Sequence, residues 1–252
     1  MTSLNDKQSE FIATVLNLKP RIAAFDCDGT LWSGDAGEGF FSWELEQGLV
    51  PEEIARWARP RYADYRAGNV PEEIMCGEMV TMHRGLREEI VQQAADKYFA
   101  LGVAANIFPE MRELVRQLRE SGCEVWAVSS SNQWIIRSGM KLFGIPQNRI
   151  LAAEVAIENG VITDRLVRVP SGRGKVEALR AAIKDPLIED SLIEDSLMND
   201  SLGCAFGNAI WDREMLALAK HPFVINPNPN LREIAVANHW TVYQPDVNHQ
   251  TR

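Results

Sequence analysis

Two aspartates separated by one residue stand at the end of a short apolar run, residues 22–26, and Gly29 follows them. Residues two apart in an extended segment point to the same side, so Asp26 and Asp28 can share one site. The paired carboxylates repel each other, and a hard divalent cation such as magnesium would stabilise them. One carboxylate could then attack a phosphoryl group while the other moves a proton. A plain strand followed by an Asp-Gly turn would give the same pattern.

Further polar residues that could bind phosphate or metal occur later in the chain. Ser129 and Ser130 follow a second apolar run, where their hydroxyls could donate to phosphate oxygens or cap the helix that follows. Lys175 lies at the start of a predicted helix and offers a compact positive charge, although a lone lysine is commonly a solvated surface residue. Asn208 and Asp212 follow a third run and, being four apart, would share one helix face near a metal. Asn208 could equally be a helix N-cap.

Strands that alternate with amphipathic helices would position these residues. The apolar runs predict strands at 22–26, 124–128, 202–206 and 223–225. Apolar spacing between the runs predicts helices around 111–118, 176–183 and 215–219. This alternation is typical of a parallel α/β sheet, in which the carboxyl ends of the strands meet at one edge and bind ligands. We therefore expect Asp26, Ser129 and Asn208 to gather there.

Three segments fall outside this alternation. Residues 35 to about 105 are rich in helical patterns and contain no strong strand signal, which predicts a helical insertion after the first strand. Residues 155–163 predict a hairpin with Asn159-Gly160 as its turn. The repeat at 187–201 has a period of five residues, which fits neither helix nor strand and is too short for a solenoid. We interpret that repeat as an expanded surface loop.

Composition excludes several classes of protein. The chain has 252 residues and a formal net charge of −9, so a general nucleic-acid or anionic-membrane surface is not expected. The four cysteines match no zinc motif, and the N-terminus lacks the apolar core of a signal peptide. We therefore expect a reduced, cytoplasmic protein whose partner is a small phosphorylated metabolite. Nothing in the sequence specifies an oligomeric state.

In their order and strand context, residues 26–30, Ser129, Lys175 and residues 207–212 resemble the motifs of the haloacid dehalogenase superfamily. The helical insertion and the hairpin before Lys175 are most similar to its phosphoserine phosphatase-like branch. The resemblance covers roughly residues 20–230. It implies an α/β fold, with a Rossmann-like parallel sheet core and a helical cap inserted after the first strand. The implied domains are a catalytic core at 1–32 and 106–252 and a specificity cap at 33–105.

The resemblance also implies a role for each motif residue. Asp26 would be the nucleophile that forms a phospho-aspartate, and Asp28 the general acid and base. The residues assigned to phosphate are Thr30, Ser129, Ser130 and Lys175, and those assigned to Mg²⁺ are Asp26, Asp28 (through its backbone carbonyl), Asn208 and Asp212. The family usually has Asp where this chain has Asn208, which predicts weaker metal binding.

Substrate choice is expected to lie in the cap. In phosphoserine phosphatases an acidic residue at the position of Asp35 binds the substrate amine, although Asp35 and Glu38 also have the spacing of a helix capping box. Trp32, Trp43 and Trp57 could form an aromatic wall for a substrate cation, such as the quaternary ammonium of phosphocholine or the amine of phosphoethanolamine, or could simply pack helices together.

The sequence therefore predicts a magnesium-dependent phosphatase of small phosphate esters. Asp28 favours phosphate esters over halides, because a halide needs no proton to leave. Two other activities stay open. A phosphotransferase would share the phospho-aspartate, and a catalytically weakened phosphate-binding protein would account for Asn208.

Overall fold

A seven-stranded sheet forms the centre of the computed structural model, which describes residues 4–183 and 202–246; the 187–201 repeat lies outside the described residues. The strand order is β4-β3-β2-β1-β5-β6-β7. The strands are β1 (Ile22–Phe25), β2 (Glu124–Asn132), β3 (Ile150–Glu158), β4 (Val161–Arg168), β5 (Cys204–Gly207), β6 (His221–Ile225) and β7 (Thr241–Tyr243). All neighbouring strands are parallel except β3 and β4. The predicted α/β class with a mostly parallel sheet is confirmed.

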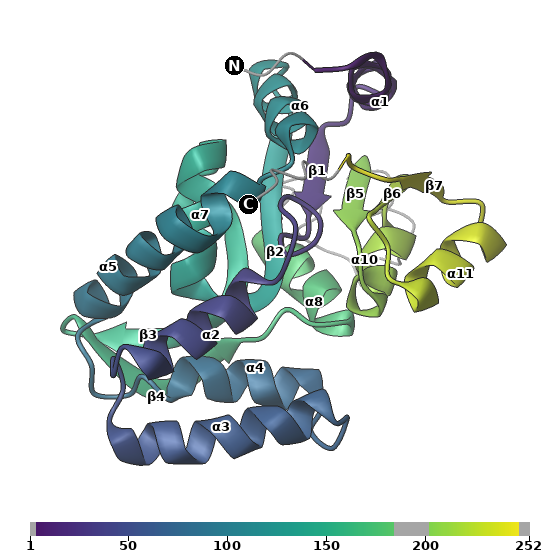
Figure 1. Cartoon of the computed structure of the whole chain (residues 1–252). Helices are drawn as coiled ribbons and strands as arrows, with labels where there is room; N and C mark the ends of the chain where they lie inside the picture. Colours follow the sequence, from purple (N-terminus) through teal and green to yellow (C-terminus); the bar gives the residue numbers. More distant parts are fainter. Residues whose placement is uncertain (1–3, 184–201, 247–252) are drawn as a thin grey trace, which may run out of the picture.

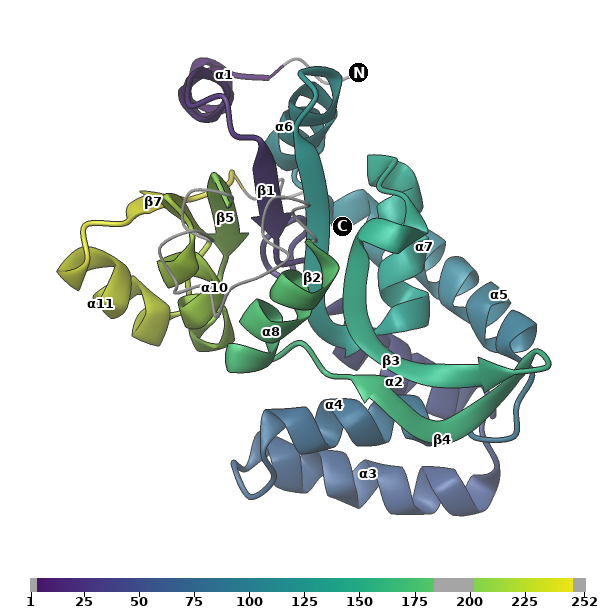
Figure 2. The same ribbon diagram turned by 180° about the vertical axis from the view of Figure 1, so that it is seen from behind.

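Helices cover both faces of this sheet (Figures 1 and 2). The helices are α1 (Asp6–Asn17), α2 (Ala36–Glu46), α3 (Glu52–Arg66), α4 (Glu72–Thr81), α5 (Glu88–Tyr98), α6 (Pro109–Glu120), α7 (Gln133–Phe143), α8 (Arg173–Ala182), α10 (Arg213–Leu218) and α11 (Pro229–Ala237). Side chains alternate along β1, so Ala23 and Phe25 pack with α1, α6 and α7, whereas Ile22 and Ala24 pack with α8, α10 and α11. In the described part of the chain, no helix has both the length and the apolar character to cross a membrane.

The carboxyl ends of β2, β1 and β5 lie side by side, because these three strands are neighbours in the sheet. Asp26 directly follows β1 and Asn208 directly follows β5. The second strand is longer than predicted: β2 continues with a change of register after Val128 as far as Asn132, so Ser129 lies in its last part. The predicted gathering of the three motif residues at one edge is confirmed.

Four helices, α2 to α5, are inserted between β1 and β2, as predicted, and we call them the helical insert. In Figure 1, α3 and α4 lie below the sheet, on the side toward which the arrow of β1 points. The insert has a small core of its own, in which Phe41 and Leu45 of α2 pack with Ala58 of α3 and with Met75 and Met79 of α4. This separate core allows α2, α3 and α4 to stand over the edge of the sheet.

The β3–β4 hairpin packs against α4 of the helical insert and is drawn above α4 and α3 in Figure 2. Its turn is formed by Asn159 and Gly160, as predicted, and both have positive φ values, 53° and 76°. The hairpin backbone supports the segment between α4 and α5, since Gly85 N donates to Ile162 O and Glu88 N donates to Gly160 O. Core and insert are therefore joined at a second place, far in sequence from β1.

Candidate active site

Asp26 is buried at the end of β1, with both carboxylate oxygens held by neighbours. Lys175 Nζ donates to Asp26 Oδ1 at 2.7 Å, and Thr30 Oγ1 donates to Asp26 Oδ2 at 2.9 Å. Burial and the nearby carboxylate of Asp212 raise the pKa of Asp26 to about 7, against the opposing effect of Lys175. The pair of donors fixes the carboxylate in one orientation, which a nucleophile requires.

Lys175 is the buried cation of the site. It lies in the first turn of α8, and its Nζ also donates to Asp212 Oδ1 at 2.6 Å and to Val128 O at 3.0 Å. Burial opposes its charged form, but the carboxylates of Asp212 and Asp26 outweigh burial and raise the pKa of Lys175 above its ordinary value. All three ammonium hydrogens thus have acceptors. The sequence placed Lys175 near phosphate; the structure places it between two carboxylates.

Asp28 accepts three hydrogen bonds. Trp32 Nε1 and the backbone N–H of Ala36 donate to Oδ1 at 2.8 and 2.6 Å, and Ser131 Oγ donates to Oδ2 at 2.6 Å. Burial, together with the charge of Asp35, raises the pKa of Asp28 to about 7. A carboxyl group that titrates near neutrality is suited to giving and taking a proton.

Asn208 and Asp212 do not share a helix face, so that prediction is wrong. Asn208 lies in the loop after β5, and Asp212 closes a single 3₁₀ turn that begins at Ile210. The turn is tighter than an α-helix because Asp212 Oδ2 accepts from the backbone N–H groups of Asn208 and Ala209, both at 2.9 Å. Both oxygens of Asp212 therefore have protein donors, and the residue holds Lys175 and the loop in place.

Gly29 provides the space that Asn208 occupies. A Cβ on Gly29 would lie 1.9 Å from Asn208 Nδ2, and the φ of Gly29 is +74°. We expect Gly29→Ala to displace the amide and to impair any activity that depends on Asn208, besides the roughly 1 kcal/mol or more that an alanine costs at positive φ.

The control for Gly29→Ala is Gly48→Ala, because Gly48 has a φ of +66° and no atom within 4 Å of its Cβ position. Thermal unfolding and phosphate release should be measured for both variants. We expect both variants to lose a similar amount of stability, and only Gly29→Ala to lose activity. Equal activity in the two variants would contradict the role given to Gly29.

The residues assigned to phosphate lie around Asp26, but they differ in accessibility. Ser129 is buried, and its Oγ accepts from Ser131 N at 3.1 Å. Thr30 is completely buried against Asp26. The N-cap of α7 is Asn132, whose Oδ1 accepts from Ile135 N at 3.0 Å, so the serines are not needed to cap that helix. Ser129 and Ser130 both line the pocket described next.

A pocket of about 590 Å³ joins the sheet edge to the helical insert. From the core it is lined by Asp26, Asp28, Ser129, Ser130, Ser131, Lys175, Asn208, Trp211 and Asp212, among others. From the insert, Tyr62, Tyr65, Arg66, Glu72, Cys76 and Met79 contribute, and none of these was singled out as a pocket residue from the sequence. One signal was present: Tyr62, Tyr65 and Arg66 have the i, i+3, i+4 spacing of a single helix face.

Asp35 caps a helix, as one of its two predicted roles requires, and its binding of a substrate amine stays a prediction. It is the N-cap of α2, accepting from Glu38 N at 2.8 Å, and it also lines the pocket. The aromatic wall is wrong, because none of its three members lines this pocket. Trp32 is completely buried, Trp43 packs beside Phe40 in α2, and Trp57 is exposed on α3.

The donor set at the sheet edge fits a hard cation such as magnesium. Asp26, Asp28 and Asn208 present oxygen atoms, which magnesium prefers. The acidic side chains lining the pocket are Asp26, Asp28, Asp35, Glu38, Glu72 and Asp212, against Lys175 and Arg66 as the basic ones. A phosphate would be repelled by this excess unless a further cation entered with it. Among the described residues, no group of three or more His, Cys, Asp or Glu side chains forms a metal site, so an ion here would also need the Asn208 amide and backbone oxygens.

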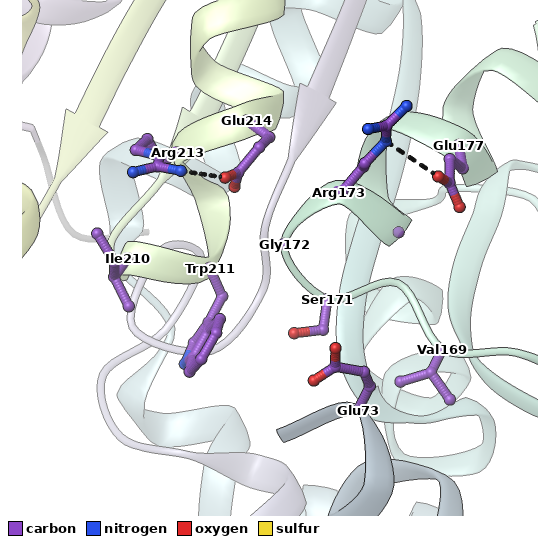
Figure 3. Close-up of a pocket in the computed structure, with 11 residues that line it drawn as sticks. Glu73, Val169, Ser171, Gly172, Arg173, Glu177, Ile210, Trp211, Arg213 and Glu214 are labelled. Carbon is purple, nitrogen blue, oxygen red and sulfur yellow. Dashed lines mark hydrogen bonds and ion pairs between the residues drawn. The ribbon is translucent and has the colours of Figure 1, made fainter. Parts of the chain in front are cut away.

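A second pocket, of about 510 Å³, adjoins the first. Figure 3 shows Trp211 on one side of it, with Ser171 and Glu73 opposite. The arginines of this pocket are already paired, Arg173 with Glu177 at 3.2 Å and Arg213 with Glu214 at 2.6 Å. Both of these arginines therefore already have a carboxylate partner, whereas Lys175 and Asp26 lie in the first pocket.

The chain belongs to the haloacid dehalogenase-like hydrolase family, whose sequence pattern matches residues 23–196, more than half of its length. The family expected from Asp26, Asp28 and their companion motifs is therefore confirmed, and with it an enzyme of the hydrolase class.

Three proteins illustrate what this chain is similar to. The Histidinol-phosphatase of Neisseria meningitidis serogroup C (strain 8013) is 24% identical over 225 residues, covering 88% of this chain and 97% of the relative. A protein with unknown function from Bordetella pertussis Tohama I has a similar structure, with a TM-score of 0.75 and 19% identity over 88% of this chain and 97% of that one. A phosphoserine phosphatase solved as a phospho-aspartyl intermediate analogue has a TM-score of 0.57 and 17% identity over 90% and 94% of the two chains. These likenesses support the fold.

Proposed function

We propose that this protein is a magnesium-dependent phosphomonoesterase that hydrolyses a small phosphate ester through a phospho-aspartate on Asp26. The observation that carries the proposal is the fixed carboxylate of Asp26, held between Lys175 and Thr30 in a pocket that also contains Asp28 and Ser129. The helical insert, with residues 33–105, acts as the cap that selects the substrate.

In the first step an oxygen of Asp26 attacks phosphorus, and the bond from phosphorus to the alcohol oxygen breaks. Asp28 gives a proton to that oxygen, so that a neutral alcohol leaves. Hydroxyls of Ser129 and Ser130 can donate to the phosphoryl oxygens. Lys175 balances the charge of Asp26 and Asp212 through its ion pairs with both carboxylates.

In the second step the oxygen of a water molecule attacks phosphorus while Asp28 takes a proton from that water. The bond from phosphorus to the Asp26 oxygen breaks, inorganic phosphate leaves, and Asp26 is restored as a carboxylate. A magnesium ion held by the Asp26 carboxylate, the backbone carbonyl of Asp28 and the Asn208 amide would offset the negative charge of the phosphoryl group. Asp212 keeps the loop that carries Asn208 in place through its two backbone hydrogen bonds.

A cationic group on the alcohol is the substrate feature that this pocket favours. On the insert side, Asp35, Glu38 and Glu72 line it, and Arg66 lies within 3.5 Å of Glu38. The name of the curated relative suggests an amino alcohol phosphate, because histidinol phosphate carries an amine and an imidazole. Histidinol phosphate therefore joins phosphoserine, phosphoethanolamine and phosphocholine as a candidate substrate.

The test is phosphate release from these four esters at a series of magnesium concentrations, for the wild type and for Asn208→Asp. We expect magnesium-dependent release. Asn208→Asp should reach half-maximal activity at a magnesium concentration lower by ~10-fold. The reason is that a charged carboxylate in place of the neutral amide strengthens binding of the ion by roughly 1.4 kcal/mol. Asn228→Asp is the control, since Asn228 lines the same pocket but caps α11.

Release without added magnesium after treatment with a chelator would refute the cofactor. An Asn208→Asp variant with unchanged magnesium dependence would refute the role of Asn208. No release from any ester at saturating magnesium, for either protein, would refute the phosphatase itself and favour a phosphate-binding protein.

A further inference from the structure

The side chain of Trp32 makes one hydrogen bond, and that bond is to the carboxylate of Asp28. The indole ring is completely buried and packs edge-on against Phe99, with ring centroids 5.2 Å apart, and near Phe143. Gly139 of α7 leaves room for it, since a Cβ there would lie 3.0 Å from the ring. This packing fixes the direction in which Nε1–H points.

The same oxygen of Asp28 accepts a second N–H group. Ala36 is the first residue of α2, and its backbone N–H reaches Oδ1 at 2.6 Å, next to the 2.8 Å bond from Trp32. A carboxylate oxygen has about two acceptor positions. Two N–H donors therefore fill Oδ1, and a proton on that oxygen would have to displace one of them.

The other oxygen has a different kind of partner. Ser131 Oγ lies 2.6 Å from Asp28 Oδ2 and lines the active-site pocket. A hydroxyl can donate to an ionised carboxylate and, after rotating, accept from a protonated one, which an N–H group cannot do. Oδ2 can therefore change its protonation without losing its neighbour.

We propose that Trp32 is a positioning residue for the acid–base aspartate. Trp32 Nε1 and the first backbone N–H of α2 both donate to Oδ1 of Asp28 and occupy its acceptor positions. Oδ2, beside Ser131, is then the oxygen that exchanges the proton. This inference rests on the proposed phosphatase activity. It adds to that activity a buried residue that does not line the active-site pocket.

The proton balance of the first step follows. As Asp26 forms its bond to phosphorus, the electron pair of the breaking bond moves to the alcohol oxygen, and the proton on Asp28 Oδ2 transfers to it. Asp28 is left as a carboxylate, with Trp32 and Ala36 on Oδ1 and the Ser131 hydroxyl now donating to Oδ2. In the second step the proton of the attacking water returns to Oδ2.

Trp134 provides a matched control for a buried indole. It is also completely buried, but its Nε1 has no hydrogen-bond partner among the described residues. Trp134→Phe therefore removes an indole of the same kind from the core without removing a bond to a carboxylate. Any effect of Trp32→Phe that exceeds this control reports on the bond to Asp28.

The test compares two leaving groups. An alkyl ester such as phosphoethanolamine needs a proton to leave, whereas p-nitrophenyl phosphate releases a stable anion and needs little help. We expect Trp32→Phe to lower kcat/KM for the alkyl ester by at least ~10-fold, and by no more than the ~10²–10⁴-fold that a positioned acid contributes in full. For the aryl ester, kcat/KM should fall by less than ~3-fold. The parameter kcat/KM covers only the steps up to release of the alcohol, which isolates this proton transfer.

Three other results would each decide the matter. Equal losses on both esters, or no loss beyond that of Trp134→Phe, would overturn the positioning role while leaving the phosphatase intact. A wild type that hydrolyses neither ester would overturn the phosphatase and this inference together. If thermal unfolding shows that Trp32→Phe does not fold, Ser131→Ala takes its place, because it removes the partner of Oδ2. It is judged by the loss of kcat/KM on the alkyl ester relative to the aryl ester. An equal loss on both esters would again overturn the proposal.

Discussion

Asp26→Asn is expected to abolish phosphate release, by ~10⁴-fold or more, without unfolding the protein. An amide cannot serve as the nucleophile, so no phospho-enzyme forms. The fold should tolerate the change, because Lys175 keeps Asp212 and Val128 O as acceptors and the amide oxygen can still accept one bond. The variant also removes a buried charge that Asp212 repels.

The contrast that tests this prediction is Asp28→Asn with p-nitrophenyl phosphate. That variant keeps the nucleophile but lacks the base for the second step, so labelled phosphate should accumulate on the protein and be released by hydroxylamine. Asp26→Asn should incorporate no label, and its denaturation midpoint should stay close to that of the wild type. Label on Asp26→Asn, or full activity in it, would place the nucleophile elsewhere.

The position of Asp26 could be predicted from sequence because its signal is local. A short apolar run that ends in a carboxylate predicts a buried strand with its functional group at the carboxyl end, and neighbouring strands bring Ser129 and Asn208 to the same edge. To place these residues together, only the order of the strands in the sheet had to be added. The helical segments between the apolar runs already indicated that neighbouring strands are parallel.

The geometry of the 207–212 loop could not be predicted in the same way. A spacing of four was interpreted with the period of a helix, whereas the side chain of Asp212 reaches back to the backbone N–H groups of Asn208 and Ala209 and closes a shorter turn. Side chains of this kind compete with the helical backbone for hydrogen bonds. Here the short turn is also stabilised by Lys175, which lies 37 residues away in the chain and donates to Oδ1, the other oxygen of Asp212.

The contributions of the helical insert were hidden for a related reason. Ser171 of the core donates to Glu72 of α4 at 2.8 Å, a contact between residues 99 apart in sequence. Trp32 appeared from the sequence as one of several aromatics that could face a ligand, and only the fold shows that it is buried beside Asp28. Contacts between core and insert depend on how elements far apart in the chain pack in three dimensions, which neither helical nor strand periodicity encodes.

Lys175→Met is expected to cost both stability and activity. Lys175 is 1% exposed and neutralises two carboxylates, with bonds of 2.7 Å to Asp26 and 2.6 Å to Asp212. Removing the cation leaves two buried acidic groups without a neutralising charge, and breaking such a buried ion pair costs about 3–5 kcal/mol. Chemical denaturation at neutral pH measures this loss, and phosphate release from the preferred ester measures the activity.

Asp212→Asn, combined with Lys175→Met, separates the two effects. The amide oxygen can still accept from the backbone of Asn208 and Ala209, while one of the two unpaired charges is gone. The double variant should therefore recover part of the lost free energy of unfolding, yet stay inactive, because the cation that holds the Asp26 carboxylate is still missing. A double variant no more stable than Lys175→Met would show that packing, and not charge, accounts for the loss. Recovery of activity along with stability would show that Lys175 supports the fold alone and that Asp26 needs no cation to react.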